Sequence, residues 1–164
     1  GYATGYGSTR EVAEAVAATL REYALVVDLQ PVRSVDTLAE YSAVVIGAPL
    51  FIFRWHKDAH RFLKRHHKEL MERPVAIFAL GPIQDPFNEK EWQDSNAQLD
   101  KELAKYPWLT PAAREMFGGK YDPQVLRFPL KMFAGDEPAS DIRDWGAIRS
   151  WAKALGSKLE PDLP

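Results

Sequence analysis

Two short, uninterrupted runs of apolar residues constrain the fold of this chain more than any other feature. They are Ala43-Val44-Val45-Ile46-Gly47-Ala48 and Val75-Ala76-Ile77-Phe78-Ala79-Leu80. A strand with one solvated face alternates apolar and polar residues, whereas a strand buried on both faces of a parallel sheet is apolar throughout. Both runs are therefore predicted to be central strands of a parallel sheet. Parallel neighbours need long crossover connections, so helices are expected between them.

Helical periodicity is present around these runs. Val12, Val16 and Leu20 recur at helical spacing, which predicts an amphipathic helix from Thr9 to about Tyr23. The pattern also predicts helices at about 58–71, 89–105 and 122–135, the last of which Pro129 would break. A further helix is expected from Asp144, as N-cap, to Gly156, as C-terminal cap, and strands are expected at 25–29 and 116–118. Strands that alternate with helices indicate right-handed βαβ units and the α/β fold class.

Length and composition limit the possibilities further. A chain of 164 residues suits one domain, 1–164, in which the polar stretch at about 82–111 reads as an insertion. The net charge of −2 gives no nucleic-acid signature. The absence of cysteine excludes disulfides, thiol catalysis and Cys-ligated metals, and fits a reducing, cytoplasmic setting. No apolar run reaches the roughly 18 residues that a membrane-spanning helix needs, and no signal peptide is visible.

The segment Thr4-Gly5-Tyr6-Gly7-Ser8-Thr9 stands between a strand-like stub and the first helix. Glycines allow close approach of a ligand, and the unpaired N–H groups at a helix N-terminus favour an anion. The hydroxyls of Thr4, Ser8 and Thr9 could donate further hydrogen bonds to a phosphate. The alternative is a Ser/Thr-capped helix after a glycine turn. The loop has no lysine, so a Walker-type nucleotide site is excluded.

Residues 2–9 resemble the phosphate loop of flavodoxin-like proteins, which wraps the phosphate of FMN. Other stretches narrow the resemblance to the flavodoxin-domain branch that includes the menaquinone-dependent protoporphyrinogen oxidases. These stretches are Gly47-Ala48-Pro49-Leu50, Trp55-His56-Lys57, Gly118-Gly119-Lys120 and Asp144-Trp145-Gly146-Ala147-Ile148.

The resemblance implies a three-layer, doubly wound, five-stranded parallel sheet with strand order 2-1-3-4-5. FMN would lie at the carboxyl ends of the strands, where the order reverses. Only Gly1-Tyr2-Ala3 remains of a first strand that should have about 5 residues, so we expect this strand to be truncated.

Three loops are expected to hold FMN by resemblance. Their residues are Thr4, Gly5, Tyr6, Gly7, Ser8 and Thr9; Pro49, Leu50, Phe51, Ile52, Phe53 and Trp55; and Leu80, Gly81, Pro82 and Asp85. The third loop would offer backbone groups to the pyrimidine edge of the flavin; from the residues alone it is equally an ordinary Gly-Pro turn. The aromatics of the second loop could flank a planar ring or pack on the domain. Phe53 stands where the family usually has the glycine whose peptide flips on flavin reduction, and phenylalanine resists positive φ.

The stretch Arg54–Lys68 is strongly basic and holds all four histidines. Residues 57, 61, 64, 65 and 68 can share one helical face, with Phe62, Leu63 and Leu70 toward the sheet. This face is either a solvated surface or a basic patch for an anionic substrate, an acidic protein or an anionic membrane surface. His56 and His60 are four residues apart, but no carboxylate completes an obvious metal set, so no metal is assigned.

The resemblance implies an FMN-dependent oxidoreductase that passes electrons from a reduced donor to a quinone-like or protein acceptor. No side chain is assigned a catalytic role, because the flavin carries the redox chemistry. A flavodoxin-type electron carrier and a flavin-free structural or regulatory domain remain alternatives. No nucleic-acid partner is expected, a homodimer stays open, and attachment to the inner face of a membrane is compatible with the basic stretch.

Overall fold

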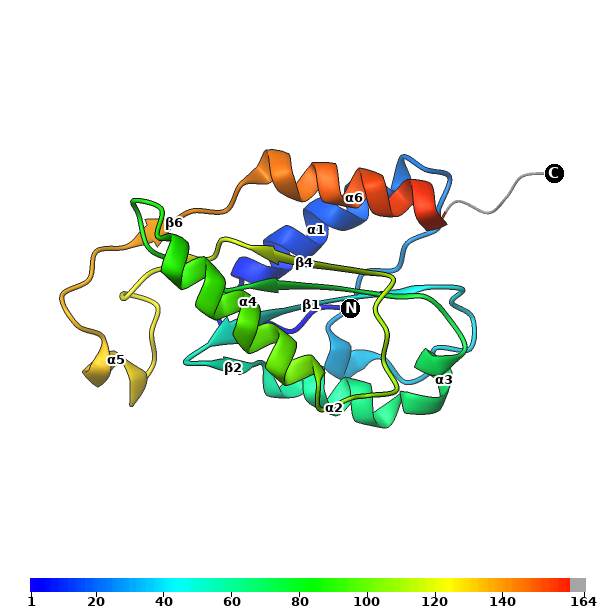
Figure 1. Cartoon of the computed structure of the whole chain (residues 1–164), viewed down its shortest axis with the longest axis horizontal. Coiled ribbons are helices and arrows are strands. Elements are labelled where there is room, and N and C mark those ends of the chain that lie inside the picture. Colours follow the sequence, from blue (N-terminus) through cyan, green and yellow to red (C-terminus); the bar gives the residue numbers. More distant parts are fainter. Residues whose placement is uncertain (160–164) are drawn as a thin grey trace.

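In a computed structural model, which describes residues 1–159, the two apolar runs form the centre of a four-stranded sheet (Figure 1). Its order is β2-β1-β3-β4. β1 (Val44–Phe51) pairs in parallel with β3 (Val75–Leu80), and β3 pairs in parallel with β4 (Ala113–Phe117). Every residue of β3 is buried, as its composition predicts. β1 runs past Ala48 to Phe51, where it turns back into the short antiparallel strand β2 (Arg54–Trp55).

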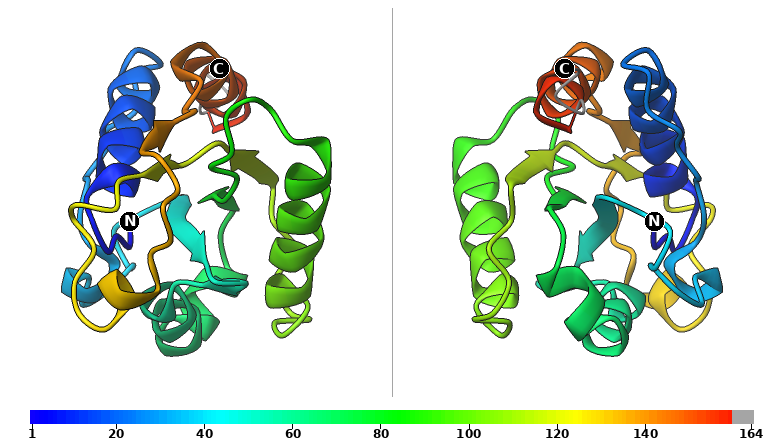
Figure 2. Two further views of the ribbon diagram at one scale, coloured as in Figure 1. Left: turned by 90° about the vertical axis from the view of Figure 1, so that its left-hand side faces the viewer. Right: turned by 90° about the vertical axis from the view of Figure 1, so that its right-hand side faces the viewer.

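Helices cover both faces of the sheet (Figures 1 and 2). On one face α1 (Ser8–Arg21) and α6 (Trp145–Leu159) pack on the side of β3 that carries Phe78. On the other face lie α2 (Lys57–Arg65), α3 (His67–Met71) and α4 (Glu89–Leu103), on the side that carries Ile77. Alternate side chains of one strand thus enter two separate cores, and the three-layer α/β class is confirmed.

The first strand is represented by Tyr2 alone, which forms parallel bridges to Gly47 and to Pro31. The predicted five-stranded sheet of order 2-1-3-4-5 is therefore formed only in part, because Pro31 and Tyr2 join the edge beside β1 through isolated bridges and not as strands. The predicted strand at 25–29 is wrong: these residues have no regular structure, and Val26 is 98% exposed. Of this segment and its continuation, only Gln30 and Val32 exchange backbone hydrogen bonds with Tyr2.

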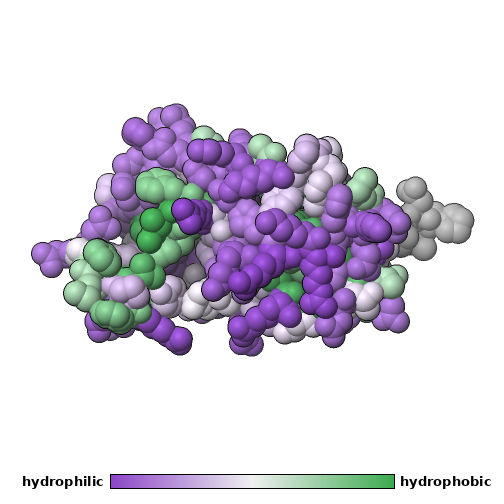
Figure 3. All heavy atoms as spheres, turned by 90° about the horizontal axis from the view of Figure 1, so that it is seen from below, coloured by the Kyte–Doolittle hydropathy of each residue, from purple (hydrophilic) through white to green (hydrophobic). Residues whose placement is uncertain are grey.

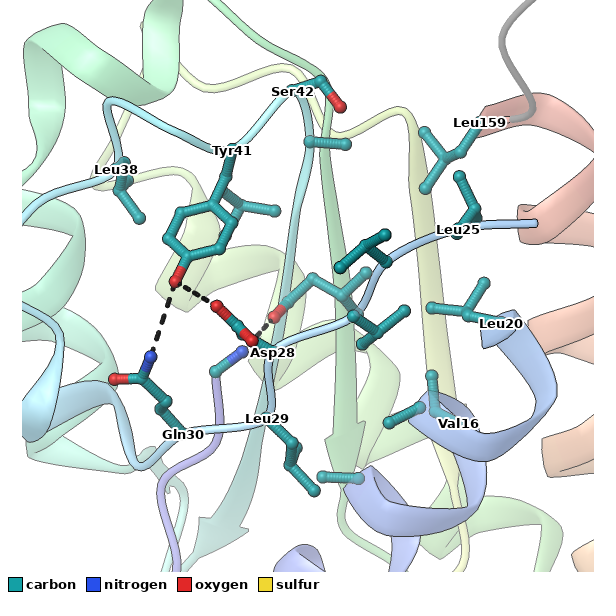
Figure 4. A pocket seen from close by; sticks show the side chains of 18 of the residues that line it. Val16, Leu20, Leu25, Asp28, Leu29, Gln30, Leu38, Tyr41, Ser42 and Leu159 are labelled. Atoms are coloured by element: carbon teal, nitrogen blue, oxygen red, sulfur yellow. Dashed lines mark hydrogen bonds between the residues drawn. The ribbon is translucent and has the colours of Figure 1, made fainter. Parts of the chain in front are cut away.

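A cavity of about 360 Å³ lies between residues 25–30 and the beginning of β1 (Figure 4). Its walls are mainly aliphatic, with Val16, Leu20 and Leu25 on one side. The hydroxyl of Tyr41 donates a hydrogen bond to Asp28 at 2.7 Å and closes another side.

Two predicted helices are shorter or interrupted. The helix expected at 58–71 divides into α2 and α3 at His66, whose backbone leaves the helical region (φ −102°, ψ 20°) while its buried ring binds the carboxylate of Glu69. The helix expected at 122–135 is wrong except for α5 (Leu130–Phe133). Pro129 precedes α5 and cannot donate an internal helical hydrogen bond, so the helix starts only after it.

The C-terminal part of the chain gives one confirmed cap and one correction. The carboxylate of Asp144 accepts a hydrogen bond from the N–H of Ala147 at 2.9 Å, as an N-cap does. Gly156 does not end α6. It is buried inside the helix, where a Cβ would stand 2.7 Å from the Tyr23 ring, so close packing is its physical reason. Before α6, a separate small sheet pairs β5 (Lys120–Tyr121) with β6 (Ser140–Asp141).

The last strand, β4, is longer than the predicted 116–118 and begins at Ala113. Its first half is polar, as suits an edge strand with one partner. No helix within residues 1–159 is long and apolar enough to cross a membrane.

Candidate functional site

A cleft of about 960 Å³ opens at the carboxyl ends of β1 and β3. Loop 4–9, the β1–β2 hairpin, the loop after β3, α4 and residues 119–130 contribute to its walls. Ten of the predicted site residues line it: Gly5, Tyr6, Ser8, Pro49, Leu50, Phe51, Ile52, Phe53, Leu80 and Gly81. In open α/β sheets this edge, where the strand order reverses, is the usual place of a ligand site.

Loop 4–9 holds its shape without a ligand. Gly7 has a φ of 95°, which suits glycine, and its N–H donates to the hydroxyl of Thr4 at 2.8 Å. Gly7 is the N-cap of α1, and no side chain caps the first turn. No other atom lies within 4 Å of the position that a Cβ would take on Gly5 or Gly7, so an anion can approach the backbone there. The uncapped N–H groups and the helix dipole make this an anion-binding end.

The side chain of Thr9 is a second feature that suits an anion. Thr9 is completely buried in the first turn of α1, and its hydroxyl has no hydrogen-bond partner among residues 1–159. By contrast, the other buried threonine of α1, Thr19, donates its hydroxyl to the carbonyl of Ala15 at 3.0 Å. A buried hydroxyl without a partner costs free energy, and a phosphate oxygen would supply one. Loop 4–9 therefore presents the kind of donors that an anion takes.

Arg143, which is distant in sequence, joins the end of this loop and the first turn of α1 to the segment after β6. Its guanidinium is 4% exposed and bonds the carboxylates of Asp141 and Glu11, as well as the carbonyl of Ser8 at 3.3 Å. The hydrogen bond to Asp141 raises the pKa of Arg143 above its ordinary value. Because both carboxylates already pair with this cation, Arg143 holds the loop in place. A lone Asp-x-Arg carries no sequence signal for such a role.

The β1–β2 hairpin turns through two non-glycine residues of positive φ, Ile52 (47°) and Phe53 (59°). The expectation that Phe53 would avoid positive φ is therefore wrong. A tight two-residue hairpin requires left-handed conformations at both central positions, and the pairing of Phe51 with Arg54 imposes it. Both side chains project outward, with Ile52 62% and Phe53 76% exposed.

The loop after β3 is held by α4. The carboxylate of Glu91 accepts hydrogen bonds from the N–H groups of Ile83, at 2.9 Å, and Gln84, at 3.0 Å. The hydroxyl of Ser140 donates to the carbonyl of Ile83 at 2.6 Å. These backbone groups, which the resemblance assigned to a flavin edge, thus already have protein partners. Glu91 was not recognised in the sequence, because an acidic residue in a polar helix carries no distinguishing signal.

Six predicted site residues do not line the cleft. Pro82 is fully buried, and Asp85 lies on a separate cavity beside Phe87. Trp55 is 2% exposed, and its indole N–H donates to the carbonyl of Ala48 at 3.2 Å, so it anchors the hairpin from the core. The other three are Thr4, Gly7 and Thr9 of the phosphate loop, which shape or underlie it.

The basic stretch is exposed but partly neutralised. Arg61 pairs with Asp58 at 3.3 Å and Arg65 with Asp36 at 3.4 Å. Phe62, Leu63 and Leu70 are buried toward the sheet, as predicted. Within residues 1–159, Arg54, Lys57, Lys64 and Lys68 have no carboxylate within 4.0 Å.

His60 and His56 of this stretch have structural roles. The ring nitrogens of His60 lie 2.6 Å from the Tyr106 hydroxyl and 2.6 Å from the buried Glu102 carboxylate, which ties α2 to the end of α4. His56 is the N-cap of α2, since its Nδ1 accepts the N–H of Asp58 at 3.2 Å. Burial lowers the pKa of His56, despite the nearby Asp58 carboxylate. In the described part of the chain no cluster of His, Asp and Glu is poised for a metal.

Comparison with known proteins agrees with this geometry. The model of the flavodoxin domain family matches residues 1–132. Two curated relatives, from Escherichia coli K12 and Leishmania major, are both named protoporphyrinogen IX dehydrogenase (quinone). The first is 25% identical over 94% of this chain and 91% of its own length, and the second 25% identical over 92% and 71%.

Solved structures show the same fold at low identity. An archaeal flavodoxin superposes with a TM-score of 0.57 at 14% identity, over 98% of this chain and 96% of its own. Flavodoxin 1 from Bacillus cereus gives 0.55 at 14%, over 96% and 95%. Rubredoxin:oxygen oxidoreductase from Desulfovibrio gigas also gives 0.55 at 14%, over 96% of this chain and 34% of its own.

The chain belongs to the flavodoxin domain family. Family membership makes it a flavodoxin-type oxidoreductase and implies a flavin cofactor.

Proposed function

We propose that this chain is an FMN-dependent oxidoreductase that takes electrons from a reduced donor and passes them to a quinone. The observation that carries the proposal is the partnerless, buried hydroxyl of Thr9 beside the uncapped N-terminus of α1. The N-terminus of α1 lies at one end of the cleft, through Ser8, and the walls include Tyr6 and Phe51, aromatic side chains suited to a planar ring.

When bound, FMN would supply the redox chemistry. The residues of this chain would bind and orient it. Gly5, Gly7, Ser8 and Thr9 would hold the phosphate, with Arg143 fixing the loop from behind. The β1–β2 hairpin would form one wall and Leu80 and Gly81 part of the floor.

The quinone acceptor is proposed from the names of the two curated relatives, as is a protoporphyrinogen-like donor. The volume of the cleft, about 960 Å³, is at the upper end of the usual range for ligand pockets, which suits a flavin together with a second ligand. Lys57 lines the cleft, and Arg54 follows the hairpin tip; both cations suit a carboxylated donor.

The test is a titration of the apo-protein with FMN and with riboflavin, which lacks the phosphate. Thr9→Val removes the orphaned hydroxyl and keeps the side-chain shape. We expect it to weaken FMN about tenfold to a hundredfold, since a hydrogen bond to a charged group is worth about 1.5–3 kcal/mol. Riboflavin affinity should stay the same. Thr19→Val, at the other end of α1, is the matched control and should change neither.

An equal loss of affinity for FMN and riboflavin would contradict the phosphate assignment. No binding of either flavin would contradict the proposed function and favour a flavin-free domain. The holo-protein is then mixed with quinones and a reduced donor. Flavin binding without quinone reduction would point to an electron carrier instead.

A further inference from the structure

Five large apolar side chains project into solvent at the mouth of the cleft. They form what we call the apolar rim: Ile52, Phe53, Phe128, Met132 and Phe133, each 62–81% exposed. Figure 3 shows hydrophobic side chains gathered over the end of the molecule that carries α5, beside a largely hydrophilic surface. Large apolar residues are seldom exposed in a group, and such a group marks an interaction surface.

The rim is built from two segments far apart in sequence that meet at one opening. The hairpin residues Phe51–Phe53 line the cleft, and so do residues 125–127 of the loop that precedes α5. α5 adds Leu130 to the cleft wall, whereas its remaining residues are exposed and none of the four is buried. A partner on the rim would therefore cover the entrance to the proposed flavin site.

Cations accompany the rim. Arg54 follows the hairpin tip, and Arg127 and Lys131 alternate with the exposed side chains of the α5 segment. Within residues 1–159 none of these three has a carboxylate within 4.0 Å. Lys64 and Lys68 add positive charge along α2 and α3. Acidic residues are present at the far end of the segment, at Asp136 and Glu137. Apolar side chains bordered by Lys and Arg are the composition of a surface that lies in a lipid interface.

We propose that the apolar rim seats on an anionic lipid bilayer, with the cleft opening toward the membrane. This inference rests on the proposed function, because a quinone dissolved in lipid would then reach the flavin site without crossing water. Five large side chains are few compared with the roughly 20–30 residues on each side of a stable protein interface. The rim is thus better suited to a fluid lipid surface than to a second copy of the chain.

The experiment is sedimentation of the FMN-loaded protein with vesicles of pure phosphatidylcholine and of phosphatidylcholine mixed with phosphatidylglycerol. We expect binding to the anionic vesicles that weakens as salt rises, since exposed charges are screened. The triple variant Phe128→Ser/Met132→Ser/Phe133→Ser should lower the partition coefficient at least about tenfold, because apolar burial drives interfacial binding. Lys131→Gln/Lys64→Gln should reduce binding to anionic vesicles only.

Matched controls lie elsewhere on the surface. Met71→Ser, at a methionine 61% exposed on α3, and Val26→Ser, at 98% exposed, should leave the partition unchanged. FMN affinity and melting temperature should be the same in the triple variant, since none of its three positions lines the cleft. The triple variant should also lose turnover with a quinone embedded in vesicles while it retains turnover with a water-soluble quinone.

Unchanged vesicle binding in the triple variant, or no vesicle binding by the parent protein, would overturn the proposal. A parent that self-associates through these residues, as shown by light scattering, would assign the rim to a second copy and overturn it as well. Vesicle binding that persists without reduction of either quinone would refute the proposed function and leave the membrane surface standing.

Discussion

The carboxylate of Glu91 lies 2.9 Å from the backbone nitrogen of Ile83, and so joins the first turn of α4 to the loop that leaves β3. Its second oxygen takes the neighbouring N–H of Gln84. The side chain of Glu91 therefore fixes the loop after β3 against the first turn of α4.

Removal of this carboxylate should loosen the turn. Glu91→Ala leaves two backbone donors without their partner, and hydrogen bonds to a charged group are worth about 1.5–3 kcal/mol. We expect a loss of about that size in the free energy of unfolding, measured by urea denaturation. Glu89→Ala removes an exposed carboxylate two residues earlier and is the control, with an expected change below about 0.5 kcal/mol. Equal effects of both variants would contradict the role of Glu91.

The cap formed by His56 predicts a dependence of stability on pH. The folded state lowers the pKa of His56, mainly through burial, and its Nδ1 accepts an N–H only when it is unprotonated. Below about pH 6.5, where an unfolded histidine protonates, the unfolded chain binds more protons than the folded one. Stability should therefore fall as the pH falls from about 6.5 toward the lowered pKa.

Replacing the cap by a residue that does not titrate tests this. His56→Asn keeps an N-cap acceptor, so its free energy of unfolding should equal that of the parent protein near pH 7.5. Between about pH 6.5 and 5 the variant should lose less stability than the parent protein does. Urea denaturation at a series of pH values measures the difference. Parallel pH profiles for the two proteins would show that His56 carries no such linkage.

The strained hairpin tip predicts a stabilising substitution. Phe53 has a φ of 59°, a conformation that costs an L-residue about 1–2 kcal/mol and glycine little. Phe53→Gly should therefore raise the free energy of unfolding by up to about 1 kcal/mol, after the larger conformational entropy that glycine gains in the unfolded chain. Arg54→Gly, one residue later in β2 and without positive φ, should instead destabilise. A loss in both variants would exclude strain at Phe53.

The sheet could be predicted because its information is local. Val75–Leu80 is apolar at every position, and only a strand covered on both faces satisfies that pattern. Residues 25–29 carry equally good strand propensity, yet they stay irregular since a strand also needs a neighbour, and Tyr2 reaches only Gln30 to Val32. Propensity describes one segment, whereas pairing depends on two.

The candidate site was predictable to the extent that it is a loop motif. Gly5, Tyr6 and Ser8 of loop 4–9 and the aromatic hairpin line a cleft at the expected edge of the sheet. The supporting residues could not be predicted. Glu91 and Arg143 act on backbone that is 8 and 135 residues away, and their roles depend on how α4 and β6 are placed.

The bond between His60 and Glu102 has a consequence for how the cleft can change its width. It joins the helix that starts at the hairpin wall to the helix that forms the insertion wall, and Gln98, which lines the cleft, also donates to Glu102. These two walls are therefore expected to move together and to keep a fixed separation. On the opposite side, α5 has no buried residue of its own. Adjustment to ligands of different size will thus occur on that side, and amide hydrogens there will exchange with solvent sooner than those of α2 and α4.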